Sequence, residues 1–123
     1  MLLCIAVWKC AVSPTGDRLN IINYYQNSLL TIARDGTLLA TLTDPELEYP
    51  YGLHVTPAGQ VLVCEYGSQT VAQVDREGTR KLASLATGDD GVWLPHSVFY
   101  SSITSSIIVG QDNNNNILVF RVE

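Results

Sequence analysis

The sequence contains the same pattern of turn residues and apolar runs more than once, and this repetition constrains the fold more than any other feature. Residues 13–16 (SPTG) align with 56–59 (TPAG) at an offset of 43, and residues 34–37 (RDGT) align with 76–79 (REGT) at an offset of 42. A third, incomplete copy extends from Pro95 to Val122. A period in the low-to-middle forties indicates a repeat architecture, in which each unit packs against its neighbours.

Every copy is built from short aliphatic and β-branched runs that are separated by Gly, Pro, Asn and Asp. The runs lie at residues 19–22, 29–32, 61–64, 71–74, 107–109 and 117–122. Such runs are typical of strands, and the Pro-x-Gly and Asp-Gly sequences between them favour tight hairpin turns. No long window has the 3.6-residue spacing of an amphipathic helix. About four short strands in each repeat are the composition of a propeller blade.

The sequence therefore predicts an all-β fold, an incomplete β-propeller arc whose blades contain four antiparallel strands. The arc is a single domain over residues 1–123, with a first blade at about 8–44, a second at about 51–88 and an incomplete third at about 95–123 that lacks its outermost strand. Propellers close with roughly 4–8 blades. We therefore expect a fragment of a longer protein; the alternative is self-association of several arcs through their open blade edges.

Three segments carry a resemblance to a known group of propellers. Residues 50–59 (PYGLHVTPAG) and 94–98 (LPHSV) resemble the opening of an NHL-repeat blade, and residues 20–29 (NIINYYQNSL) resemble the core of a YVTN repeat. The third copy departs from both patterns, because Ser101–Ser105 replaces its Pro-x-Gly turn. The resemblance implies a six-bladed TolB-like propeller, and a place in the C-terminal part of tripartite-motif proteins, which include ubiquitin ligases. RNA-binding relatives use basic rims.

The charge balance and the cysteines narrow the function classes. Seven Lys and Arg against 12 Asp and Glu give a net charge of −5, which disfavours nucleic acid as a partner. Cys4, Cys10 and Cys64 form no C-x-x-C pair, so neither a disulfide framework nor a zinc site is predicted. Without glycosylation sequons, this composition favours a cytoplasmic location. The apolar residues 1–8 are too short to span a bilayer and are expected to form a strand, so no membrane partner is predicted.

Candidate site residues come from the ends of the two innermost strands of each blade. Counting symmetrically about the hairpin turns pairs three sets of residues at one rim, in which polar and aromatic side chains recur. The pairs are Trp8 with Asn23, Tyr51 with Glu65, and His96 with Gln111. Because propeller function gathers at one rim and in the central channel, these six residues, together with Trp93, are the predicted partner-binding positions.

The two segments that lead into the second and third blades place acids beside aromatics. Their acids are Asp44, Glu46, Glu48, Asp89 and Asp90, and their aromatics are Tyr49, Tyr51 and Trp93. This mixture suits a protein or peptide partner with a basic surface, since aromatics supply contact area and charges steer association. The alternative interpretation is that the acids only solvate the loops while the aromatics pack between blades.

An enzymatic interpretation depends on His96 and Glu65. His96 could point into the channel and bind a metal, and Glu65 could serve as a general base or a calcium ligand. These roles fit part of a calcium- or zinc-dependent lactonase or lyase, which some propellers that the sequence resembles are. The alternative is that His96 only hydrogen-bonds across a loop and that His54 is a packed structural residue. No nucleophile elbow or phosphate-binding loop occurs, so no catalytic residue is assigned and no cofactor is expected.

The function predicted from the sequence is therefore that of a non-catalytic NHL-like interaction module, which binds a protein partner through the rim formed by its inter-blade segments. The metal-dependent enzyme, with a channel-mouth site shared with further blades, remains the alternative.

Overall fold

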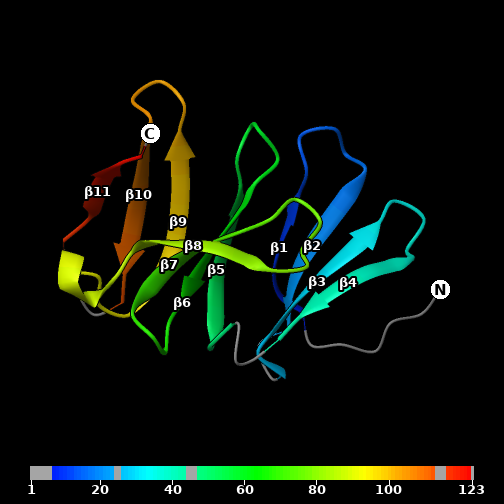
Figure 1. Cartoon of the computed structure of the whole chain (residues 1–123), viewed down its shortest axis with the longest axis horizontal. Coiled ribbons are helices and arrows are strands. Elements are labelled where there is room, and N and C mark those ends of the chain that lie inside the picture. Colours follow the sequence, from blue (N-terminus) through cyan, green and yellow to red (C-terminus); the bar gives the residue numbers. More distant parts are fainter. Residues whose placement is uncertain (1–6, 24–25, 44–46, 113–115, 123) are drawn as a thin grey trace.

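The computed structural model describes residues 7–23, 26–43, 47–112 and 116–122, with the side chains of residues 7 and 8 left aside. Its strands form three antiparallel sheets that stand side by side (Figure 1). Blade 1 contains β1 (Val7–Val12), β2 (Arg18–Asn23), β3 (Ser28–Ala33) and β4 (Leu38–Leu42). Blade 2 contains β5 (Pro50–Val55), β6 (Val61–Glu65), β7 (Thr70–Val74) and β8 (Lys81–Ala86). Blade 3 contains β9 (Pro95–Ser101), β10 (Ser106–Gln111) and β11 (Leu118–Arg121).

These elements confirm the predicted all-β class and the antiparallel blade. Five of the six predicted runs lie within strands, and the sixth overlaps β11. Among the described residues the third sheet has three strands. The strand expected at the N-terminus lies outside the described residues up to residue 6. A 3-10 turn, η2 (Gly88–Asp90), connects blades 2 and 3.

The hairpins between the two innermost strands define one end of the arc, which we call the turn rim. In blades 1 and 2 the Pro-x-Gly sequences form these hairpins with a positive φ at the glycine, +75° at Gly16 and +88° at Gly59. Each glycine N–H donates to a carbonyl three residues earlier, that of Ser13 or Thr56. A side chain at either glycine would be strained, which explains why the motif recurs. These hairpins lie at the top of Figure 1.

Apolar side chains from alternate strand positions fill the spaces between blades. Between blades 1 and 2 the buried residues include Ile22, Leu29, Val61 and Val63. Between blades 2 and 3 the buried residues are Leu62, Cys64, Val71, Ala86, Val92, Val98, Ile107 and Val109. Blade 2 therefore buries both of its faces, as the period-2 alternation of its strands requires. This packing holds the innermost strands β1, β5 and β9 side by side.

The opposite end, which we call the loop rim, consists of the strand ends around residues 47–51 and 87–96. Here the expected pairing is wrong by one residue in every blade. The observed pairs are Val7 with Asn23, Pro50 with Glu65, and Pro95 with Gln111. The cause is a β-bulge, in which one extra residue is inserted into the innermost strand. The extra residue is Trp8 in blade 1, Tyr51 in blade 2 and His96 in blade 3.

Candidate functional site

Two predicted site residues, Glu65 and Gln111, accept hydrogen bonds from the segments that connect the blades. The buried Glu65 accepts a hydrogen bond at Oε1 from the backbone N–H of Glu48, at 3.0 Å. The buried Gln111 accepts the equivalent bond at Oε1 from the backbone N–H of Trp93, at 2.7 Å. A second backbone hydrogen bond recurs in both places. The Tyr66 N–H donates to the Tyr49 carbonyl, and the Asp112 N–H donates to the Leu94 carbonyl. A carboxylate and an amide therefore perform the same structural task, and neither presents its functional group to solvent.

Asn23 occupies the same position in blade 1 and is also buried. Its Nδ2 donates to Gln26 Oε1 at 3.1 Å, while its Oδ1 finds no partner among the described residues. The residue that corresponds to Glu48 and Trp93 is Ile5, which lies outside the described residues. Asn23, Glu65 and Gln111 were predicted as partner-binding positions. Their burial makes them supports of the rim rather than parts of its contact surface.

Glu65 is the one buried carboxylate of this set, and its charge is partly compensated. Lys81 Nζ lies 3.3 Å from Glu65 Oε2 and donates a hydrogen bond to it. Burial raises the pKa of Glu65 above its ordinary value, whereas the Glu48 N–H and the Lys81 charge oppose that rise. Both carboxylate oxygens are therefore occupied by protein donors, which leaves little capacity for a general base or a calcium ligand.

The bulged residues of blades 2 and 3 meet across the blade boundary. The ring of Tyr51 stacks on that of Tyr66, with centroids 5.3 Å apart, and lies 6.2 Å from the ring of His96. Tyr66 Oη also donates to Asp112 Oδ2 at 3.2 Å, which links the second strand of blade 2 to blade 3. The bulges thus bring the predicted residues Tyr51 and His96 together. The side chain of Trp8, predicted at the same position, lies outside what the structure describes.

This meeting depends on a close approach of the innermost strands. A Cβ atom added at Gly52 would collide with the carbonyl oxygen of His96, far inside van der Waals contact. Glycine is therefore required here for backbone proximity. Sequence reasoning did not use Gly52, although a glycine inside a predicted strand is a signal of close backbone approach.

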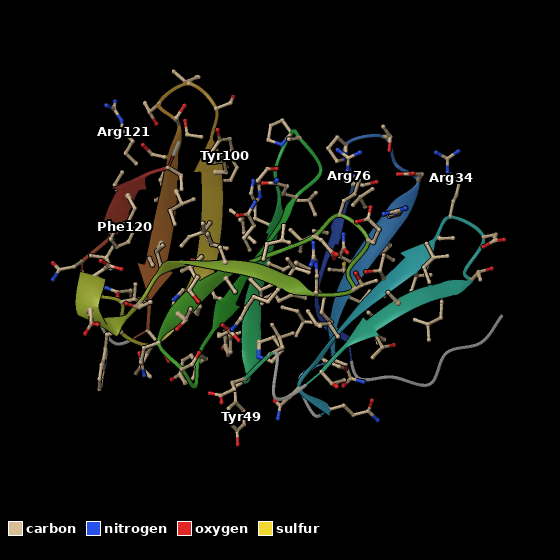
Figure 2. The ribbon with its side chains drawn as sticks, viewed as in Figure 1. Arg34, Tyr49, Arg76, Tyr100, Phe120 and Arg121 are labelled. Atoms are coloured by element: carbon tan, nitrogen blue, oxygen red, sulfur yellow. The ribbon has the colours of Figure 1, made fainter. Side chains whose placement is uncertain are left out.

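The exposed surface of the loop rim carries the aromatic and acidic side chains that precede the bulges. Tyr49 is 54% exposed and Trp93 is 57% exposed, and Figure 2 shows Tyr49 extending away from the sheets at this rim. Glu48, Asp89 and Asp90 are exposed beside them. The carboxylate of Asp90 also accepts a hydrogen bond from the backbone N–H of Thr87. Asp44 and Glu46, which were predicted in the same surface, lie outside the described residues.

The rim segments that carry these aromatics have an unusual backbone. Tyr49 and Leu94, which stand directly before Pro50 and Pro95, both adopt positive φ angles, of 47° and 45°. A bulky residue in this region is uncommon and costs of order 1–3 kcal/mol, so the surrounding hydrogen bonds must enforce it. Hydrogen bonds are present on both sides of these residues: Glu65 and Gln111 accept the N–H groups of Glu48 and Trp93, and the carbonyls of Tyr49 and Leu94 accept bonds from the following strand ends. These bonds restrain the rim backbone.

Among the described residues, no group of three His, Cys, Asp or Glu side chains is placed to hold a metal ion. His54 packs against Phe99 with ring centroids 4.6 Å apart, and burial lowers its pKa. The two rings line an apolar hollow of about 480 Å³ near the turn rim, together with Val12, Pro57 and Ile103. In the described part of the chain, no helix is long or apolar enough to cross a membrane.

Comparison with known proteins supports the fold and leaves the family open. No family model matches the chain, and no curated protein sequence matches it. Among solved structures, hydrazine synthase of Kuenenia stuttgartiensis is similar with a TM-score of 0.79 at 21% identity, over 94% of this chain and 32% of that one. A catalytically inactive virginiamycin B lyase from Staphylococcus aureus with quinupristin has a TM-score of 0.63 at 17% identity, over 98% of this chain and 43% of that one.

A second structure of the same lyase has a TM-score of 0.60 at 17% identity and covers 92% of this chain and 40% of the lyase. The neighbours are β-propellers, so the chain is an arc of β-propeller blades. It spans between 32% and 43% of the length of these neighbours. Similarity at this level of identity establishes the fold alone.

Proposed function

We propose that this arc is a non-catalytic, NHL-like interaction module, of the six-bladed TolB-like kind, that binds a basic protein or peptide segment through its loop rim. The observation that carries the proposal is the repeated construction of the rim. In both described inter-blade segments, at least one acid and an aromatic side chain are exposed, and a buried side chain accepts a hydrogen bond from the backbone beside them.

The chemistry of this surface matches a cationic segment. Tyr49 and Trp93 offer exposed ring faces on which an arginine or lysine can stack, worth about 0.5–2 kcal/mol for each contact. Glu48, Asp89 and Asp90 attract the same charges and raise the association rate. Because the rim backbone is held in place before binding, little conformational entropy is lost in the complex. A cytoplasmic location is part of this proposal and agrees with the free thiols Cys10 and Cys64.

The proposal is tested by titrating the chain with a fluorescent nona-arginine peptide at low and high salt. We expect binding that weakens steeply with salt, and a loss of affinity of about 3- to 30-fold in Trp93→Ala. Glu48→Gln should weaken binding by about 2- to 3-fold, whereas Glu77→Gln, an exposed acid at the turn rim, should have no effect. Equal losses in the two charge variants would show attraction by net charge alone and would reject the loop rim as the site.

A second candidate is a role in a propeller enzyme of the lyase or lactonase kind that uses calcium or zinc. The contact between Tyr51 and the half-buried His96 favours it, since both bulged side chains lie beside each other at the channel mouth. The remaining ligands would come from outside the described residues. Stoichiometric calcium or zinc binding, measured by calorimetry and lost in His96→Ala, would favour this candidate over the interaction module.

A further inference from the structure

A polar hollow lies at the turn rim between blades 1 and 2. It has a volume of about 280 Å³, which is close to the lower end of the size range of small-molecule sites. The residues that line it come from the two Pro-x-Gly hairpins, from β2 and from the β7–β8 turn, and we call it the inter-hairpin hollow. Both of its walls belong to described, consecutive blades, so the hollow is independent of any further blade that adjoins the arc.

A buried polar side chain that breaks the repeat lines this hollow. Asn20, on β2, is only 2% exposed, whereas the corresponding position in blade 2 holds the apolar Leu62. Thr31 Oγ1 donates to Asn20 Oδ1 at 3.2 Å, and no described residue accepts a hydrogen bond from Asn20 Nδ2. Burying a polar group in place of an apolar one costs free energy unless its hydrogen-bonding capacity is satisfied. Asn20 Nδ2 is thus left as a donor for a bound group.

Two guanidinium groups also line the inter-hairpin hollow. Arg18, at the start of β2, donates through Nη1 to the Arg76 carbonyl oxygen at 2.9 Å. Arg76, which is labelled in the upper part of Figure 2, donates through Nη2 to the Ala58 carbonyl oxygen at 2.6 Å. A guanidinium carries five N–H donors, so these bonds hold each group in place and leave further donors for an anion.

Two glycines allow Arg76 to reach this position. A Cβ atom at Gly59 would lie 2.9 Å from Arg76 Nε, and a Cβ atom at Gly78 would collide with Thr31 Oγ1 of blade 1. The β7–β8 turn therefore approaches blade 1 as closely as only a glycine permits. This approach brings Arg76 of blade 2 to the same hollow as Arg18 of blade 1.

The charges of the hollow match a ligand with a single negative charge. Asp17 also lines it, and hydrogen bonds from the hydroxyls of Thr15 and Ser13 lower the pKa of its carboxyl, so Asp17 is ionised at neutral pH. Two guanidinium charges opposed by one carboxylate favour a monoanion over a dianion. Pro14 and Pro57 add apolar surface on which a short hydrocarbon chain can pack.

We propose that the inter-hairpin hollow binds a short-chain monocarboxylate. The carboxylate pairs with the guanidinium groups of Arg18 and Arg76 and accepts a hydrogen bond from Asn20 Nδ2, while the hydrocarbon chain packs on Pro14 and Pro57. Hydrogen bonds between guanidinium and carboxylate groups are directional and stronger than those between neutral groups. The site lies at the opposite end of the arc from the loop rim, so it is independent of the proposed loop-rim function.

The test is a titration of the full chain with sodium butyrate at constant ionic strength, followed by NMR of the N–H groups. We expect saturable shifts of the Gly16 and Gly59 amides and of the Nε–H signals of Arg18 and Arg76, while the Gly91 amide near the loop rim stays constant. Butyrate should bind about 3- to 10-fold more tightly than acetate, because its additional methylene groups are buried. The n-butylammonium ion, which has the chain without the carboxylate, should not bind.

Two variants and a control locate the site. Asn20→Leu should weaken butyrate binding about 10-fold and keep the fold, because Leu62 occupies the corresponding position in blade 2. Arg18→Gln should weaken binding by about 10-fold or more, since a charged donor is lost. Arg80→Gln removes the same charge from an exposed residue of the same rim that does not line the hollow, and it should bind butyrate like the unmodified chain. Thermal unfolding without ligand checks that each variant folds.

Several outcomes would overturn the proposal, and three of them need no variant. These three are the absence of saturable shifts with butyrate, equal affinity for butyrate and n-butylammonium, which would indicate apolar adsorption, and tighter binding of inorganic phosphate than of butyrate, which would indicate a general anion site. Undiminished binding in Asn20→Leu and Arg18→Gln would place the ligand elsewhere. Equal losses in Arg18→Gln and Arg80→Gln would show attraction by the charge of the rim alone and would also reject the site.

Discussion

At the scale of single residues, the most informative pair is Glu65 and Gln111. They hold equivalent loops by equivalent hydrogen bonds, yet one is an acid and the other an amide. The amide needs no counter-ion, whereas the buried Glu65 relies on Lys81. The chain therefore contains its own neutral substitute for the acid. This comparison explains why a recurring acceptor in the sequence, Asn23, Glu65 and Gln111, need not indicate catalysis.

Replacing Glu65 tests this comparison. Glu65→Gln should keep the bond from Glu48 N–H and remain within about 1 kcal/mol of the unmodified chain near pH 7. Glu65→Ala should lose about 1–3 kcal/mol in the free energy of unfolding, because the loop N–H is left unpaired. Urea unfolding at several pH values, followed by circular dichroism, measures both.

The pH dependence of the same variants has a defined sign. The folded-state pKa of Glu65 is raised by burial, so the folded chain holds this proton more tightly than the unfolded chain. The contribution of Glu65 to stability is therefore greatest at low pH and is lost as the pH rises through the interval between its ordinary and its raised pKa. As the pH falls, the free energy of unfolding of the unmodified chain should therefore rise relative to that of the Glu65→Gln variant. The opposite trend would show that the Lys81 ion pair outweighs burial.

Gly52 sets the spacing of the innermost strands. Gly52→Ala should lower the free energy of unfolding by about 1–3 kcal/mol, since the new Cβ would collide with the His96 backbone. It should also separate Tyr51 from His96. Gly88→Ala is the matched control, because its nearest neighbour would be Gln69 Cβ at 3.8 Å, an ordinary contact. Thermal unfolding compares the two, and equal midpoints would mean that the strands separate without cost.

At the scale of elements, the sequence was a good guide to strands and a poor one to their register at the loop rim. Apolar runs and Pro-x-Gly turns located the strands, because both are local properties of the chain. The symmetric count about each turn failed at Trp8, Tyr51 and His96, since a bulge adds a residue that no local pattern announces. The positions at the loop rim were therefore located, but which of their side chains are buried and which are exposed was not predicted.

In blades 1 and 2 a second repeated interaction joins the two hairpin turns at the turn rim. Arg34 Nε donates to the carbonyl oxygen of Gly16 at 3.2 Å, and Arg76 Nη2 donates to that of Ala58 at 2.6 Å. Both arginines lie at this rim in Figure 2. The two residues aligned in the sequence repeat, but only the structure shows that they fasten the β3–β4 turn of blade 1, and the β7–β8 turn of blade 2, to the Pro-x-Gly hairpin.

Removing such a fastener should have a local effect. Arg76→Ala should lower the free energy of unfolding by about 0.5–1.5 kcal/mol and speed the exchange of the Gly59 amide. Arg80→Ala is the control, because Arg80 Nε is 3.9 Å from Asp75 and its side chain is largely exposed, so its ion pair contributes little. Exchange at Gly59 that is unchanged in Arg76→Ala would show that the glycine turn is stable by itself.

At the scale of the whole molecule, the two rims differ in their chemistry. The described part of the loop rim carries Glu48, Asp89, Asp90 and Asp112 and no arginine, while Arg18, Arg34 and Arg76 lie at the turn rim. Those arginines are used to bind backbone carbonyls, including one contact between blades in which Arg18 donates to the carbonyl of Arg76 at 2.9 Å. The turn rim also carries acids, Asp17, Asp35, Asp75 and Glu77, but its arginines offset their charge, so the cationic partner that we propose is expected at the loop rim.

Stability should also vary along the arc, because blade 2 is covered on both faces and blade 3 on one. In a linear array of repeats, each unit gains stability from each neighbour that it touches. Cys64 reports on the boundary between blades 2 and 3, since its thiol is completely buried there and burial raises its pKa to about 12. It can react with a thiol reagent only when that boundary opens.

The prediction is that blade 3 detaches before the rest of the arc unfolds. In a chain with Cys4→Ser and Cys10→Ser, labelling of Cys64 at low protein concentration should be faster than amide exchange at Ile22 and Leu29, between blades 1 and 2. Equal rates would mean that all three blades unfold as one unit.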